Sequence, residues 1–133
     1  MKHHTATAAA TGLALLCATA VAAAPASASH GGAAGLVQKS GSCTNGRGVW
    51  TLKAKPDDGR VEIEFEVDTN QVGQLWHVRI TDNRQAVVSR DVRTTARSGS
   101  FTVNPCTANR VGTDTIRAHA FRGDRVCGGQ VQV

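Results

Sequence analysis

Residues 61–68 read V-E-I-E-F-E-V-D, a run in which apolar and acidic residues strictly alternate. This period of two places the four apolar side chains on one face of a β-strand and the four acids on the other. Because four neighbouring carboxylates would repel each other in a dry interior, the acidic face must lie in water. The run therefore predicts a half-buried strand of the kind found in antiparallel sheets.

The preceding segment predicts the first partner of this strand. Residues 49–55 also alternate, and they are followed by Pro-Asp-Asp-Gly at 56–59, a sequence suited to a tight turn. The resulting hairpin places Lys53 and Lys55 on the same outer face as the glutamates. We therefore expect cross-strand charge pairs on that face, each worth roughly 0.2–1 kcal/mol.

Five further segments show the same alternation between turn residues, at 75–81, 86–92, 98–103, 114–121 and 126–133. The chain thus has about seven short strands and no convincing helix, which predicts an all-β, immunoglobulin-like antiparallel β-sandwich. A small barrel of the same strands is the alternative. Two marks of immunoglobulin domains are missing, namely the disulfide between the second and sixth strands and the tyrosine corner.

The N-terminus has the features of a secretory leader. A basic start at residues 2–4 precedes an apolar run that is too short for a membrane span, and Ala26-Ser27-Ala28 matches the small-x-small pattern of a cleavage site. We expect a signal peptide over 1–28, a flexible lead-in over 29–42 and the β-sandwich over 43–133. Within the lead-in, a short edge strand starting at Leu36-Val37 is the alternative. The mature protein would then be secreted, with no attachment to a membrane.

Three cysteines remain after the leader. Cys43 precedes the first predicted strand and Cys127 begins the last one. Since first and last strands are often neighbours in a sandwich, we expect a Cys43–Cys127 disulfide, which export permits. Cys106 follows a proline in a predicted loop and would be a free thiol or form an intermolecular bridge.

The charge balance is mildly basic. The formal net charge is +5, of which Lys2 in the leader supplies one. Charges of both signs are interspersed, as on an ordinary soluble surface. We expect an unknown extracellular partner, for which the cell wall or another acidic polymer is the candidate. Nucleic acid is not expected, because most of the five Trp and Phe rings are needed for the core.

Four segments taken together carry a resemblance to known proteins. They are P-D-D-G-R-V-E-I-E-F-E-V-D, S-G-S-F-T-V, G-T-D-T-I-R-A and C-G-G-Q-V-Q-V, beginning at residues 56, 98, 112 and 127. The set resembles small secreted actinobacterial proteins with an immunoglobulin-like β-sandwich and no assigned biochemical role. The resemblance implies one cysteine before the first strand and one in the last, which matches Cys43 and Cys127. It implies a fold and an exported location, but no activity.

The chemistry-bearing residues do not indicate an enzyme. There is no Gly-x-Ser-x-Gly nucleophile elbow, and no metal or cofactor motif. His77 and His119 are expected on the outward faces of the third and sixth strands, which are usually neighbours in this fold. Arg79 and Arg117 flank them and would oppose a metal cation. This geometry predicts a basic outer face on one sheet and an acidic outer face on the other.

One further motif is the tripeptide Arg122-Gly123-Asp124, which animal cell-adhesion receptors read. It falls at the predicted tip of the last hairpin, where Gly-Asp is also ordinary turn chemistry.

The function expected from these features is that of a secreted, non-catalytic binding or interaction module with an unknown ligand. The alternatives are a small-molecule carrier resembling the enediyne apoproteins, which needs a deep apolar pocket, and a secreted protease inhibitor. The inhibitor would use residues 104–113 as a stiff protruding loop.

Overall fold

The computed structural model describes residues 35–95 and 97–133, and the predicted signal peptide lies outside them. In these two ranges the chain forms nine β-strands and one short 3-10 turn, η1, over Thr44–Gly46. The strands are β1 (Val37–Ser42), β2 (Val49–Asp57), β3 (Arg60–Asp68), β4 (Leu75–Asp82), β5 (Gln85–Arg93), β6 (Ser100–Val103), β7 (Cys106–Ala108), β8 (Thr115–Arg122) and β9 (Arg125–Gln132).

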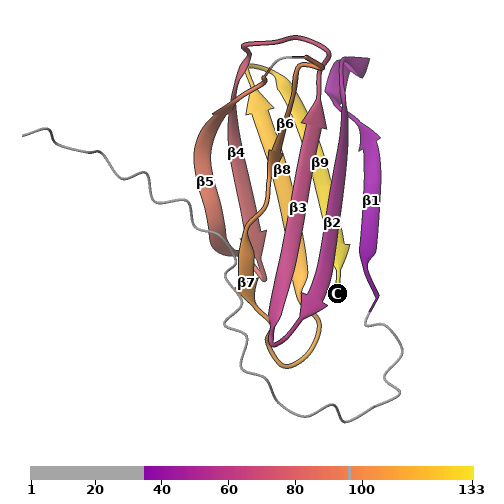
Figure 1. The fold of residues 1–133 in the computed structure, drawn as a ribbon, viewed down its shortest axis with the longest axis vertical. Helices are drawn as coiled ribbons and strands as arrows, with labels where there is room; N and C mark the ends of the chain where they lie inside the picture. The colour runs from indigo at the N-terminus through magenta and orange to yellow at the C-terminus, as the bar shows by residue number, and fades with distance from the viewer. Residues whose placement is uncertain (1–34, 96) are drawn as a thin grey trace, which may run out of the picture.

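The strands form two antiparallel sheets that pack face to face (Figure 1). One sheet has the order β1-β2-β3-β6, with β7 also paired to β3, and the other has the order β5-β4-β8-β9. The prediction of an all-β, two-layered antiparallel fold is confirmed. Within the described residues, no helix is long and apolar enough to span a membrane.

The hairpin of β2 and β3 has the predicted register. Lys53 pairs with Glu64 and Lys55 with Glu62, and the Lys53 ammonium lies 2.7 Å from the Glu64 carboxylate. The hydrogen bond and charge of Glu64 raise the pKa of Lys53. The lysines therefore offset part of the acidic ladder on this face.

The alternating apolar residues fill the space between the sheets, as predicted. The largest fully buried side chains include Trp76 and Phe65, which lie on β4 and β3 and so come from opposite layers. The inward positions of the main strands are all buried: Trp50, Leu52, Ala54, Val61, Ile63, Phe65, Val67, Trp76, Val78, Ile80, Phe101, Val103, Ile116, Ala118 and Ala120.

The structure has two strands more than the seven expected. Val37–Ser42 form β1 and pair with β2, so these residues are not a flexible lead-in and the alternative of an edge strand starting near Val37 is correct. Cys106–Ala108 form β7 against β3, inside the predicted loop 104–113. Both are edge segments whose sequences lack a clear alternation, and backbone pairing with a long neighbour defines them.

The expected disulfide joins Cys43, just after β1, to Cys127 in β9. It closes the end of the sandwich where the two sheets meet at β1 and β9. Cys106 lies in β7 and does not carry the free thiol that was one of its two predicted states.

Next to the disulfide, the Trp50 indole fills the seam between β1 and β9. It is buried between Gly41 of β1 and Gly129 of β9. A Cβ atom at Gly129 would lie 2.6 Å from the indole, closer than real contacts allow. The two glycines therefore provide the space in which this large ring closes the core.

Candidate functional site

The outward side chains of the β5-β4-β8-β9 sheet form a regular array. His77 of β4 lies opposite Phe121 of β8, and Arg79 lies opposite His119. Arg117 is the next outward residue of β8. We call these five residues the β4–β8 outer face.

The prediction that the strands carrying His77 and His119 are adjacent is confirmed. β4 and β8 pair directly, but His77 and His119 occupy diagonal positions rather than directly opposite ones. In the described residues, no group of three or more His, Cys, Asp or Glu side chains is placed to hold a metal ion.

His77 instead makes two hydrogen bonds to β5. Its Nδ1 lies 2.8 Å from Asp91 Oδ1, and its Nε2 lies 3.3 Å from Ser89 Oγ. This Asp–His–Ser order has the connectivity of a catalytic triad. Sequence reasoning missed it because the three residues become neighbours only through the register of β4 with β5.

Two features of the surroundings disfavour catalysis by this trio. The side chains of His77 and Asp91 are 49 % and 61 % exposed, so water competes for their hydrogen bonds. An oxyanion hole needs N–H donors converging beside the nucleophile, whereas the N–H groups of a strand lie in the plane of the sheet, across the direction of the side chains. The trio therefore orients the His77 ring and holds the carboxylate of Asp91.

His119 and Phe121 form a pair on β8. Their ring centroids are 6.0 Å apart with an interplanar angle of 27°, and the phenyl ring remains 39 % exposed. Partial burial, helped by the charge of Arg117, lowers the pKa of His119. The imidazole is accordingly held toward its neutral form, which favours contact with the phenyl ring.

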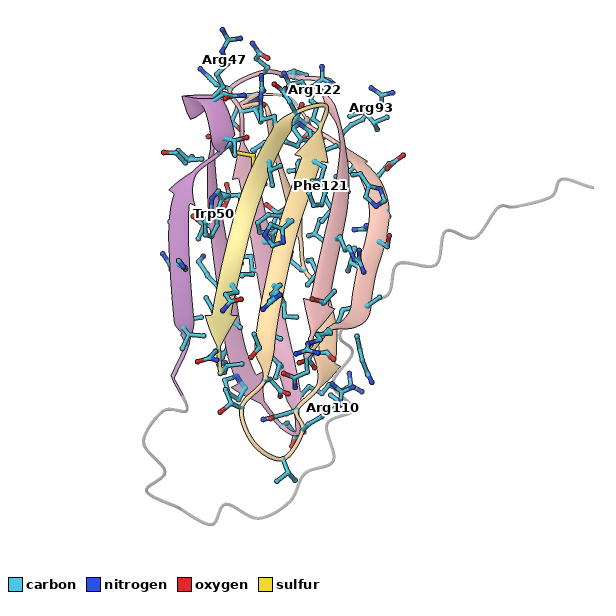
Figure 2. All side chains as sticks on the ribbon, turned by 180° about the vertical axis from the view of Figure 1, so that it is seen from behind. Arg47, Trp50, Arg93, Arg110, Phe121 and Arg122 are labelled. Carbon is cyan, nitrogen blue, oxygen red and sulfur yellow. A yellow bond between two sulfur atoms is a disulfide. The ribbon has the colours of Figure 1, made fainter. Side chains whose placement is uncertain are left out.

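The arginines of this face are not neutralised. Neither the Arg79 nor the Arg117 guanidinium has a hydrogen-bond or ion-pair partner among the described residues. Arg93 and Arg122 lie beyond Phe121 at the hairpin end of the same sheet (Figure 2). The exposed phenyl ring therefore has cationic side chains on either side of it along the strands.

The opposite outer face has the predicted contrast in charge. On β3 the outward positions are Glu62, Glu64, Glu66 and Asp68, and Lys53 is the one basic residue of this face that forms an ion pair in the described part of the chain. The charged side chains of the two outer faces thus differ in sign.

The Arg122-Gly123-Asp124 tripeptide lies at the tip of the β8–β9 hairpin. Gly123 and Asp124 form the two-residue turn between the paired residues Arg122 and Arg125. The Asn45 amide of η1 lies 3.5 Å from the Asp124 carboxylate. The tripeptide is therefore part of a short turn held against η1, and its recognition by a receptor stays a prediction.

The opposite end of the sandwich carries two buried acids. Asp82 is fully buried, and its Oδ2 accepts hydrogen bonds from Thr107 at 3.1 Å and Arg110 at 2.9 Å. Among the described residues, its Oδ1 has no hydrogen-bond partner. The nearby Asp114 carboxylate accepts from the backbone N–H of Arg110. Burial raises the pKa of Asp82, and the proximity of Asp114 adds to this shift.

The Arg110–Asp114 hydrogen bond also bears on residues 104–113, the loop that a protease inhibitor would present. The Arg110 N–H donates to the side chain of Asp114 at 3.1 Å, and β7 holds the beginning of the segment against β3. Val111 is fully exposed at the tip. A protease cleft binds an extended strand, but the Arg110–Asp114 contact folds this tip into a tight turn.

Comparison of the chain with protein-family models, with curated proteins and with solved structures found no match.

Proposed function

We propose that this protein is a secreted, immunoglobulin-like β-sandwich that binds an extracellular partner through its β4–β8 outer face, without catalysing a reaction. The partner is an acidic polymer such as one of the cell wall. The observation that carries the proposal is the pair of unneutralised guanidinium groups, Arg79 and Arg117, beside a half-exposed phenyl ring. Guanidinium groups without an acidic partner are available for carboxylates and phosphates of a ligand.

Export is supported by the leader-like N-terminus and by the Cys43–Cys127 disulfide, a cross-link that persists in oxidising compartments. The immunoglobulin-like assignment is supported by the two antiparallel layers and by the large tryptophan at the centre of the core. The carrier alternative receives less support, because the side chains between the layers form one buried apolar cluster.

Co-sedimentation with cell envelopes of the producing organism tests the binding. We expect the mature protein to pellet with envelopes, and the Arg79→Glu/Arg117→Glu double variant to remain in solution. The control Lys39→Glu/Lys55→Glu makes the same change in net charge on the other sheet and should pellet like the wild type. Equal loss in both variants would show that net charge, and not this face, determines binding.

The absence of catalysis has its own test. A fluorophosphonate probe labels serines that an adjacent base activates. We expect the wild type to show no more labelling than the Ser89→Ala variant. Labelling of Ser89 that disappears in His77→Ala would show that the surface trio is a working nucleophile, and the non-catalytic proposal would be wrong.

A further inference from the structure

We infer that the ligand of the β4–β8 outer face is a linear polysaccharide whose sugar rings carry carboxylate groups. This inference rests on the proposed function, and it adds the chemical class of the polymer. It follows from three properties of the face: its regular, exposed array of side chains, its one exposed Trp or Phe ring, and the arrangement of its charged and polar neighbours.

The face is repetitive and largely exposed to solvent. Its residues are outward positions of two paired strands, and neighbouring strands in a sheet lie about 4.8 Å apart while outward positions repeat every ~6.7 Å. Such a surface can contact several units of an extended polymer, whereas it would cover only one side of a small molecule.

Phe121 provides a surface for a ring. It is the one Trp or Phe ring exposed in the described residues, since Trp50, Trp76, Phe65 and Phe101 are buried. His119 stacks on one side of it. The C–H face of a sugar ring packs favourably on such an apolar, electron-rich surface.

The charged neighbours of this ring suit carboxylates attached to sugars. Arg79 lies opposite both His119 and Ser89, and Arg117 lies opposite Gln130. Each guanidinium therefore has a hydroxyl, amide or imidazole group next to it. A guanidinium binds a carboxylate through two parallel hydrogen bonds, while these neighbours can bond to the hydroxyls of the same sugar.

Two other occupants fit the face less well. Single-stranded nucleic acids are held by several aromatic rings on which successive bases stack, and this face exposes one. A second copy of the chain could bring its acidic β2–β3 face against this one. However, the Glu64 carboxylate of that face is already paired with Lys53.

The test measures binding of the mature, disulfide-bonded protein to soluble polymers by isothermal titration calorimetry at two salt concentrations. Polygalacturonate is the probe, dextran is the uncharged sugar polymer, polyphosphate is the anionic polymer without rings, and oligo-dT represents nucleic acid. Sedimentation velocity at the same protein concentrations reports self-association. Circular dichroism checks that each variant remains folded.

We expect polygalacturonate to bind at least tenfold more tightly than the other three polymers. Arg79→Gln/Arg117→Gln should weaken this binding at least tenfold and make it less dependent on salt. Phe121→Thr should weaken it severalfold by the same factor at both salt concentrations, because it removes an uncharged contact. Lys39→Gln/Lys55→Gln, the charge-matched control on the other sheet, should change it less than twofold.

The outcomes separate this inference from the proposed function. Three results would exclude a polysaccharide as the ligand while leaving the face as a binding site. They are equal binding of polyphosphate, tighter binding of oligo-dT, and an unchanged affinity for polygalacturonate in Phe121→Thr. Equal weakening by the control variant would overturn the face itself. Concentration-dependent dimers that disappear in Arg79→Gln/Arg117→Gln would identify a second copy as the occupant.

Discussion

Asp82 is the residue whose environment has the clearest consequence for stability. Its carboxyl group is fully buried beside Asp114, and burial raises its pKa above the usual value of 3.8. Between that value and its raised pKa, the folded protein keeps a proton that the unfolded chain has released. This contribution to stability is therefore complete at low pH and is lost as the pH rises through the pKa of the folded state.

Asp82→Asn removes this titration while keeping the shape of the side chain. We expect the free energy of unfolding of the variant, relative to the wild type, to increase between pH 4 and pH 7. Each unit of pKa difference corresponds to about 1.4 kcal/mol. Urea unfolding at both pH values measures the difference, in which the ionisable groups distant from Asp82 cancel. A difference that does not change with pH would contradict the assignment.

The titration of His119 changes stability with pH in the opposite direction from that of Asp82. Its pKa is lowered, so protonation is less favourable in the folded protein than in the unfolded chain. Its contribution to stability is present above the unfolded value near 6.5 and is lost as the pH falls toward the folded value. Arg79 faces it from β4 and Arg117 from its own strand, while Gly128 of β9 adds no charge.

At the scale of strands, the seam between β1, β2 and β9 depends on glycines that accommodate Trp50. Gly129→Ala would place a methyl group 2.6 Å from the indole, and overpacking of this kind costs about 1–3 kcal/mol. Urea unfolding should show this loss. In the Trp50→Leu background the same substitution should cost much less, because the smaller side chain leaves room. Equal costs in the two backgrounds would show that the indole is not the obstacle.

The strands also show how much the sequence could predict. Strict alternation defined β2, β3, β4 and β8 and their inward residues, because one residue of slip would turn every apolar side chain outward. The adjacency of β4 and β8 and the difference in charge between the two outer faces follow from the usual order of strands in a sandwich.

Other parts of the site could not be predicted because they depend on register. The diagonal placement of His77 and His119, and the contact of His77 with Ser89 and Asp91, follow from which residue pairs with which. The β4–β5 pairing also shifts between Ile80 and Thr81, an irregularity that no alternation pattern indicates. Nothing in the sequence distinguishes Asp82, since a lone acid at a strand end usually lies in water.

At the scale of the whole molecule, one covalent link connects positions 84 residues apart. In the chain-entropy model, closing a loop of this length stabilises the fold by about 4–5 kcal/mol. Cys43→Ser/Cys127→Ser should therefore lower the free energy of unfolding by an amount near this value, measured by urea unfolding under oxidising conditions. A loss below about 1 kcal/mol would show that the packed sheets alone determine stability.

The central claim is that one face of the sandwich binds and the other does not. The most direct test is an amide NMR titration of the isotope-labelled mature protein with the acidic polymer fraction extracted from the producer's envelope. We predict that the largest chemical-shift changes occur at Arg79, Arg117, His119 and Phe121, with little change along β2 and β3. Changes centred on β2 and β3, or spread evenly over both sheets, would contradict the account.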